Sequence, residues 1–196
     1  MDALTDADVL RIFEGSGALL SGHFVLTSGY HSARYFEKFN VLSQPGHVET
    51  LCRELAARLE HTRPDLVVGP TTLGVLLAYE VAKHLGTPAA YAERDASGTR
   101  VLKRGARAET GQRVLVVDDI LTTGGSVREC IDLVDAAGAT LCGVGLLVDR
   151  AGGEVTFPAP TVALLTLNVE KFAPDAVPDW LAAVPISRPG STGKAP

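Results

Sequence analysis

The sequence predicts an α/β protein with a parallel sheet flanked by helices. Short buried strands alternate with amphipathic helices between residues 65 and 148, which is the order typical of such a sheet. The composition agrees, since 46% of the 196 residues are hydrophobic and 21% are charged, as in ordinary globular proteins. This length supports one substantial core and permits one domain or two small ones.

The N-terminal part precedes the alternating region and has its own pattern. Thr5 or Asp6 can cap a first helix, which should end near residues 15–17. Residues 23–42 are rich in aromatic and β-branched side chains and are interrupted by Ser28-Gly29, which predicts short strands around a turn. Apolar residues then recur at helical spacing over residues 47–60.

The alternating region continues to the C-terminal part. We predict strands at residues 65–69, 89–92, 114–117 and 141–148, and helices at 73–85 and 124–137. Residues 94–112 are polar, basic and glycine-containing, which indicates a long loop or a loose hairpin. Another strand is expected at 161–169 and a helical turn at 180–184. Residues 187–196 carry no apolar anchor, so we expect a disordered tail.

Charge and cysteine content exclude several classes of protein. The net charge of −5 argues against a nucleic-acid-binding protein, which usually carries a basic face. The acidic N-terminus predicts no signal peptide, and no apolar run is long enough to cross a membrane. Cys52, Cys130 and Cys142 are odd in number and far apart, which indicates reduced thiols in a cytoplasmic protein without a disulfide or metal role.

Residues 114–126, VLVVDDILTTGGS, carry the strongest functional signal. A buried strand runs into two acids, and glycines and hydroxyl residues then open a helix. In open α/β sheets ligands bind beyond the carboxyl ends of strands, and such a turn can hold a phosphate with backbone amides and hydroxyls. Asp118 and Asp119 are placed to accept hydrogen bonds from sugar hydroxyls. Neither a Walker A nor a GxGxxG pattern is present. The segment therefore predicts a ribose 5-phosphate site, and a structural turn with chance glycines is the alternative.

This segment resembles the 5-phosphoribosyl 1-diphosphate (PRPP) motif of type I phosphoribosyltransferases. The resemblance implies one domain over residues 1–186, with a core parallel sheet and a small hood built from about residues 18–45 and 155–184. It also implies release of diphosphate and a need for Mg²⁺ held mainly by PRPP rather than by protein ligands. The PRPP-binding residues that it implies are Thr72, Arg94, Asp118, Asp119, Ile120, Leu121, Thr122, Thr123, Gly124, Gly125 and Ser126.

Two further segments resemble orotate phosphoribosyltransferases and concern the base and the diphosphate. Residues 22–38 are similar to the hood segment of that family, which implies that Ser28, Tyr35 and Phe36 border the flat base. Residues 68–80 resemble the diphosphate-binding loop and the helix behind it. The chain departs from some family members by carrying Thr27 and Leu73 where they have lysines. The alternatives are an amphipathic hairpin and an ordinary strand–loop–helix unit.

Residues 93–105 contain four cations, Arg94, Arg100, Lys103 and Arg104. The corresponding loop of the family folds over the active site of a neighbouring subunit, which implies a homodimer with a shared loop. Arg94 aligns with an arginine that contacts diphosphate, and Lys103 is our choice of catalytic cation. Arg100 and Arg104 remain alternatives to Lys103 as the catalytic cation. The non-functional alternative is that these cations belong to a basic hairpin exposed to solvent, which is the usual meaning of such a run of charges.

Residues 146–152, LLVDRAG, place Arg150 directly after a strand end. A guanidinium matches a carboxylate with two parallel hydrogen bonds, and orotate is the pyrimidine that carries a carboxylate. The spacing from Thr122 also agrees with the family, so Thr122 and Arg150 are expected at the orotate. A surface arginine is the alternative.

These resemblances imply an orotate phosphoribosyltransferase of pyrimidine (UMP) biosynthesis, which converts PRPP and orotate into orotidine 5′-monophosphate and diphosphate. Asp118, Asp119 and Lys103 are the expected catalytic residues. Three other functions stay open at this point. They are a transferase for another base such as a purine, a PRPP-binding regulator, and a degenerate enzyme that binds its ligand without turnover.

Overall fold

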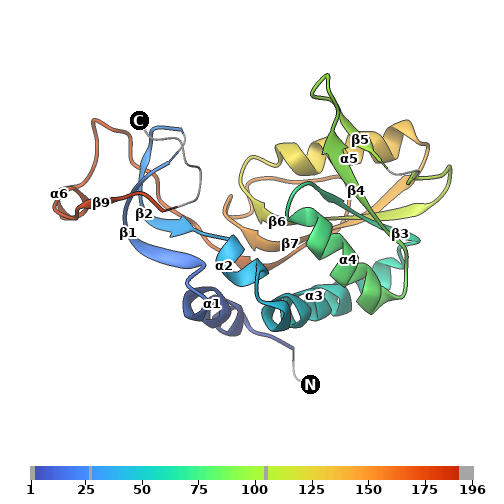
Figure 1. Ribbon diagram of the computed structural model, residues 1–196, viewed down its shortest axis with the longest axis horizontal. Helices are drawn as coiled ribbons and strands as arrows, with labels where there is room; N and C mark the ends of the chain where they lie inside the picture. The colour runs from blue at the N-terminus through green and yellow to red at the C-terminus, as the bar shows by residue number, and fades with distance from the viewer. Residues whose placement is uncertain (1–2, 27, 104–105, 190–196) are drawn as a thin grey trace.

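The computed structural model describes residues 3–26, 28–103 and 106–189, and it has a large core and a smaller hood (Figure 1). The core sheet has the strand order β5-β4-β3-β6-β7-β8. All neighbouring strands are parallel except β5, which is antiparallel to β4. The predicted mainly parallel sheet is therefore confirmed. Its strands are β3 (Leu66–Pro70), β4 (Ala89–Arg94), β5 (Arg100–Leu102), β6 (Arg113–Leu121), β7 (Thr140–Asp149) and β8 (Thr161–Thr166).

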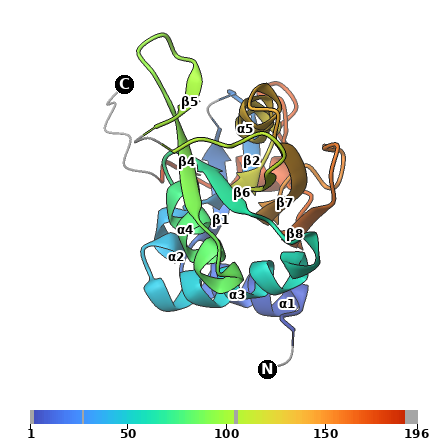
Figure 2. The ribbon, with the colours of Figure 1, turned by 90° about the vertical axis from the view of Figure 1, so that its right-hand side faces the viewer.

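Helices cover both faces of this sheet (Figures 1 and 2). One face packs against α1 (Asp6–Gly15), α3 (Pro45–Leu59) and α4 (Gly74–Leu85), and the other packs against α5 (Gly125–Ala136). Thr5, one of the two predicted candidates, caps α1 with its side chain. Because both faces are covered, the central strands are continuously apolar, and Val114, Leu115, Val116 and Val117 are all fully buried.

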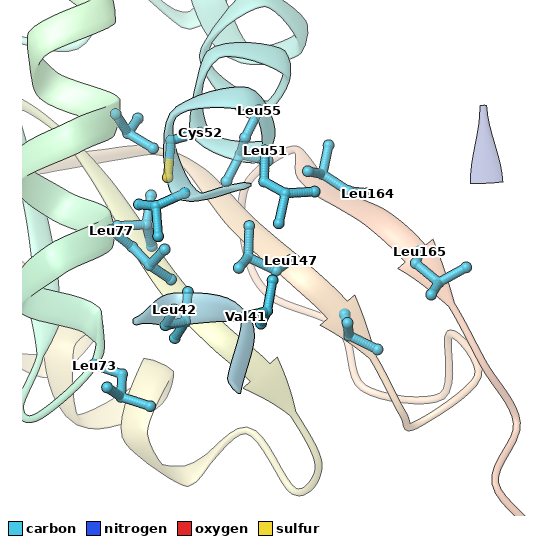
Figure 3. Close-up of a cluster of buried hydrophobic side chains, with 14 of the residues drawn as sticks. Val41, Leu42, Leu51, Cys52, Leu55, Leu73, Leu77, Leu147, Leu164 and Leu165 are labelled. Carbon is cyan, nitrogen blue, oxygen red and sulfur yellow. The ribbon is translucent and has the colours of Figure 1, made fainter. Parts of the chain in front are cut away.

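Two short helical elements lie between the longer ones, and the first of them follows the hood strand β2 (His31–Phe36). The helix α2 (Phe39–Leu42) buries Val41 and Leu42 in the same cluster as Leu73 and Leu77 (Figure 3). A 3-10 turn, η1 (Glu60–Thr62), leads from α3 into β3. The sequence pattern did not predict α2, because four residues are too few to show a helical period.

The hood is a three-stranded sheet in the order β2-β1-β9. β1 (Leu19–Val25) and β2 (His31–Phe36) are antiparallel, which confirms the predicted strands around a turn. β9 (Ile186–Ser187) lies parallel to β1, and α6 (Asp179–Ala182) precedes it. His23 and His31 join these parts, since His23 Nε2 lies 2.6 Å from His31 Nδ1 and His23 Nδ1 lies 2.9 Å from the Val184 carbonyl.

The structure corrects several of the sequence-based boundaries. β8 pairs with β7 in the core sheet, so the C-terminal part of the hood begins after Thr166 rather than near residue 155. Ser187 belongs to β9 because backbone pairing with β1 fixes it without an apolar side chain, and residues 190–196 of the expected tail lie outside the described residues. β6 continues to Leu121, which places both predicted acids inside the strand.

The direction of the strand order changes between β3 and β6, and this change fixes where a ligand can bind. From β3 the chain crosses through α4 to β4 on one side, whereas β6, β7 and β8 follow on the other side. Ligands of open α/β sheets bind outside the carboxyl ends of the strands at such a point. Over the described residues, the structure contains no helix with the length and apolar character needed to cross a membrane.

Candidate active site

A cleft of about 540 Å³ lies at the carboxyl ends of β3 and β6, between the core and the hood. The core half is formed by the ends of these strands, the segment after β7 and the first turn of α5. The hood half is formed by β2, the turn before it and Lys171. The lining residues are Leu26, Ser28, Tyr35, Phe36, Lys38, Pro70, Thr71, Thr72, Leu73, Gly74, Asp118, Asp119, Ile120, Thr122, Thr123, Ser126, Arg150 and Lys171.

The Thr122–Ser126 segment forms a recess of about 60 Å³ at the start of α5. Gly124 precedes the helix with φ of 79°, a left-handed conformation that favours glycine. A Cβ at this position would lie 2.9 Å from Val155 Cγ1. Hydroxyl side chains of Thr122, Thr123 and Ser126 face the cleft, and the first amides of α5 have no partner within the helix. This arrangement suits a phosphate group.

Asp118 and Asp119 are both buried at the end of β6. The Asp119 amide donates to Asp118 Oδ1 at 2.9 Å, and the Ile120 amide donates to Asp119 Oδ1 at 2.7 Å. Burial and the neighbouring Asp119 charge raise the pKa of Asp118 to about 7. Lys38 Nζ lies 2.7 Å from Asp119 Oδ2 and partly opposes this rise. The pair thus offers carboxylate oxygens to the cleft, one of them already opposite a cation.

The loop between β3 and α4 is held by close contact of two glycines. A Cβ on Gly69 would lie 2.0 Å from the carbonyl oxygen of Gly74, so only glycine fits. The peptide bond between Thr71 and Thr72 is cis. Thr72 lines the cleft as predicted. Leu73 also lines it, but its side chain is only 5% exposed and packs mainly in the core cluster.

Arg150 follows β7 and enters the cleft from the core side. Asp149 accepts hydrogen bonds from the Ala151 and Gly153 amides at 2.7 and 2.9 Å, and the Arg150 amide donates to the Leu121 carbonyl at 2.9 Å. The guanidinium lies over the Phe36 ring, 5.2 Å from its centroid. Its Nε is buried without a hydrogen-bond partner among the described residues, and burial lowers the pKa of Arg150. A buried hydrogen-bond donor without a partner costs free energy, so the Arg150 guanidinium is suited to bind an acceptor group of a ligand.

The predicted base-bordering residues also meet in this cleft. Ser28, Tyr35 and Phe36 all line it. The Phe36 ring is fixed by an edge-to-face contact with Phe13, at 6.0 Å between centroids, and Tyr35 packs on Phe24 at 5.5 Å. Phe36 and Arg150 therefore form one surface although they come from the hood and the core.

Of the predicted loop cations, the three that the structure describes (Arg94, Arg100 and Lys103) do not line the cleft. Arg94 pairs with Glu129 of α5 and donates to the Gly98 carbonyl at 2.6 Å. Lys103 Nζ lies 3.0 Å from Glu93 Oε1. Arg100 is 7% exposed, with Nε 2.7 Å from Glu129 Oε2 and a terminal nitrogen 2.8 Å from the Ala92 carbonyl, so it fixes the base of the hairpin. Arg104 lies outside the described residues.

Two charged cleft residues, Lys38 and Lys171, were missed by the sequence analysis. Lys38 ends the hood segment that was compared with the family, but nothing in its local sequence distinguishes it from a surface lysine. Lys171 follows the last core strand at a position where the pattern predicts only irregular chain. Both were identifiable only after the hood had been placed over the core.

Comparison with known proteins agrees with this geometry. Residues 41–174 match the phosphoribosyl transferase domain family. The chain belongs to the phosphoribosyltransferase family. The orotate phosphoribosyltransferase of Pelotomaculum thermopropionicum is 47% identical over 188 residues, which are 96% of this chain and 98% of that protein. The orotate phosphoribosyltransferase of Desulforamulus reducens is 45% identical over 94% of this chain and 96% of its own length.

Solved structures of other phosphoribosyltransferases have the same fold as this phosphoribosyltransferase. The crystal structure of orotate phosphoribosyltransferase from Aeropyrum pernix has a TM-score of 0.69 and 27% sequence identity, covering 81% of this chain and 93% of that one. An adenine phosphoribosyltransferase from Thermoanaerobacter pseudethanolicus, at 21% identity and a TM-score of 0.60 over 68% of this chain and 88% of its own, shares the fold. The predicted type I phosphoribosyltransferase fold is thus confirmed.

Proposed function

We propose that this phosphoribosyltransferase transfers the phosphoribosyl group of PRPP to orotate in pyrimidine (UMP) biosynthesis. The products are orotidine 5′-monophosphate and diphosphate. The observation that carries the choice of base is Arg150, whose buried Nε has no hydrogen-bond partner among the described residues and whose guanidinium lies on the Phe36 ring. A flat base that bears a carboxylate matches this combination of a cation and an aromatic wall. Relatives named orotate phosphoribosyltransferase, up to 47% identical over nearly the whole chain, support the same assignment.

PRPP fits the core half of the cleft in one orientation. The 5′-phosphate occupies the recess formed by residues Ile120, Leu121, Thr122, Thr123, Gly124, Gly125 and Ser126. The ribose hydroxyls then reach Asp118 and Asp119, and the diphosphate extends toward Thr72 in the loop after β3. Orotate lies against Tyr35, Phe36 and Ser28, with its carboxylate at Arg150 and its edge near Thr122.

The reaction forms a bond between orotate N1 and ribose C1 and breaks the bond from C1 to the diphosphate oxygen. The electron pair of that bond leaves with the diphosphate, and the proton of orotate N1 is released to solvent. The sugar passes through an oxocarbenium-like state, and the attack comes from the opposite face with inversion. Asp118 and Asp119 hold the ribose and favour the positive charge that develops on it. Catalysis therefore rests mainly on positioning and on charge stabilisation.

Mg²⁺ fits this cleft as an ion that arrives with PRPP. Across residues 3–26, 28–103 and 106–189 there is no group of three or more His, Cys, Asp or Glu side chains that could cage a metal. Asp118 and Asp119 supply oxygen atoms of the kind that Mg²⁺ prefers, but too few to replace its oxygen ligands from a diphosphate. When bound, Mg²⁺ would neutralise charge on the leaving diphosphate.

The loop cations complete the proposal. Arg94 binds diphosphate and Lys103 acts as the catalytic cation only if the hairpin moves from the position that Glu129 and Glu93 hold here. Arg100 is not a candidate for this role, since it is buried in the base of the hairpin. We place the moving hairpin over the cleft of a second subunit, so the working enzyme is a homodimer. The three cysteines are free and buried, which supports a cytoplasmic location.

The test is orotate consumption with PRPP and Mg²⁺, followed by ultraviolet absorbance, with adenine, hypoxanthine, xanthine and uracil in parallel. Turnover of orotate alone, abolished by EDTA, is the expected result. Turnover of a purine would reassign the base. If no base reacts while calorimetry still detects PRPP binding, the protein is a regulator or a degenerate enzyme.

A further inference from the structure

The cations that line the cleft limit which of its side chains can bind the diphosphate. Among the described residues, its cationic side chains are Lys38, Arg150 and Lys171. Arg150 is positioned for the carboxylate of the base. At position 73, where some family members carry a lysine, this chain has a leucine that is 5% exposed and packed in the core cluster.

The element that packs in the same cluster as Leu73 also carries a cation. Val41 and Leu42 of α2 share the hydrophobic cluster with Leu73 and Leu77 (Figure 3). Lys38 is the residue directly before α2, so this packing fixes its backbone beside the loop after β3. The side chain is 43% exposed and lines the cleft, so its charge is available to a ligand.

The cleft brings Lys38 together with the loop after β3, since Lys38, Thr71 and Thr72 all line it. Lys38 Nζ lies 2.7 Å from Asp119 Oδ2, at the end of β6, and β6 is the strand that pairs with β3. Lys171 lies on the hood beside Phe172, which pairs with His31, and it forms no ion pair with any carboxylate among the described residues.

We propose that Lys38 binds the diphosphate of PRPP and thereby replaces the cation that this chain lacks at position 73. Asp119 is the counter-ion of Lys38 in the substrate-free enzyme. When PRPP enters, its ribose takes the Asp119 carboxylate and its diphosphate takes the Lys38 ammonium, so that neither charge is left without a partner. The inference rests on the proposed function only in taking PRPP as the ligand, and it requires no turnover of orotate.

A substitution of Lys38 alone has two effects that must be separated. Lys38→Met removes the diphosphate contact, but it also leaves Asp119 buried without its counter-ion. The experiment therefore compares Asp119→Asn with the double variant Lys38→Met/Asp119→Asn, in which neither form contains an unpaired Asp119 charge. Affinities are measured by calorimetry with Mg²⁺ and inorganic diphosphate, and separately with ribose 5-phosphate.

We expect Lys38→Met to weaken diphosphate binding by about 10-fold or more in the Asp119→Asn background, as for loss of one charge-assisted contact. Ribose 5-phosphate affinity should change by less than about 2-fold, because that ligand has no diphosphate. Lys38→Arg should retain most of the diphosphate affinity. Lys83→Met, which removes an exposed lysine of α4, is the control for the change in net charge and should bind as the parent does.

Two results would overturn the proposal. Equal diphosphate affinity of Asp119→Asn and of the double variant would mean that Lys38 acts only by neutralising Asp119. Equal weakening of diphosphate and ribose 5-phosphate would mean that Lys38 supports the whole cleft and does not contact the leaving group. If orotate is not turned over but these affinities follow the expected pattern, only the proposed reaction is at fault.

Discussion

The core half and the hood half of the cleft are built in different ways. The core half consists of strand ends, a helix start and the loop after β3, which close packing and hydrogen bonds hold in place, as at Gly69 and Asp149. The hood half consists of long side chains, among them Phe36 of β2 and, outside the strands of the hood sheet, Lys38 and Lys171. In the proposed function the core half binds the phosphates and ribose, which need set positions. The hood half borders the base, and by our inference its Lys38 adds a contact to the leaving diphosphate.

The largest expected effect comes from the acid shared by both halves. Asp119→Asn should lower kcat by about 100- to 1000-fold, since it removes a charge that favours the developing positive charge on the ribose. Steady-state kinetics with saturating PRPP and orotate measure it. Asp132→Asn, an exposed residue of α5 with the same change in charge, is the control. An unchanged kcat in Asp119→Asn would remove this residue from the mechanism.

Rigidity of the core half is tested at Gly69. Gly69→Ala places a methyl group 2.0 Å from the Gly74 carbonyl oxygen, so β3 and α4 must separate. We expect a loss of about 3 kcal/mol in the free energy of unfolding, measured by urea denaturation, together with weaker PRPP binding.

Gly46→Ala is the matched control for this substitution. Gly46 lies in α3 with nothing within 4 Å of the added atom, and alanine is the better helix former, so stability should stay equal or rise slightly. Similar losses in both variants would contradict the close contact after β3.

Arg150 connects the two halves, because it comes from the core and rests on Phe36 of the hood. Arg150→Ala should raise the KM for orotate by about 10- to 100-fold and leave the KM for PRPP within about 3-fold, as for loss of a charge-assisted hydrogen-bond pair. Arg128→Ala is the control, since Arg128 also lies 5.2 Å from a phenylalanine ring, that of Phe157, but outside the cleft lining. Equal changes in both KM values would exclude a specific carboxylate contact.

The smallest effect concerns the protonation of Asp118. Its pKa is raised to about 7, so between the ordinary carboxyl range and pH 7 the native state holds a proton that the unfolded state has released. Stability should therefore fall as pH rises through this window, by at least about 1 kcal/mol. Asp118→Asn should flatten this slope in urea unfolding between pH 5 and pH 8. An identical dependence of stability on pH in the parent and in Asp118→Asn would show that burial does not raise the pKa of Asp118.

Local sequence was sufficient wherever consecutive residues build the feature. The helix cap at Thr5, the alternation of strands and helices and the recess at residues 122–126 all follow from short patterns, since each depends on neighbouring backbone. The boundary of the hood could not be predicted from the sequence in this way. The local sequence of β8 indicates only a strand, and its pairing with β7 is what assigns it to the core sheet.

The sequence by itself determined the α/β class, the recess at the start of α5 and the acids beside it, because periodicity and glycine placement act over a few residues. Only the tertiary structure decided which distant side chains share the cleft. It placed the Arg150 guanidinium over the Phe36 ring and paired Lys38 with Asp119. It also paired Arg100 with Glu129 at the base of the hairpin, away from the cleft. The physical reason is that side-chain contacts between distant segments depend on how helices and sheets pack, which no local pattern of residues records.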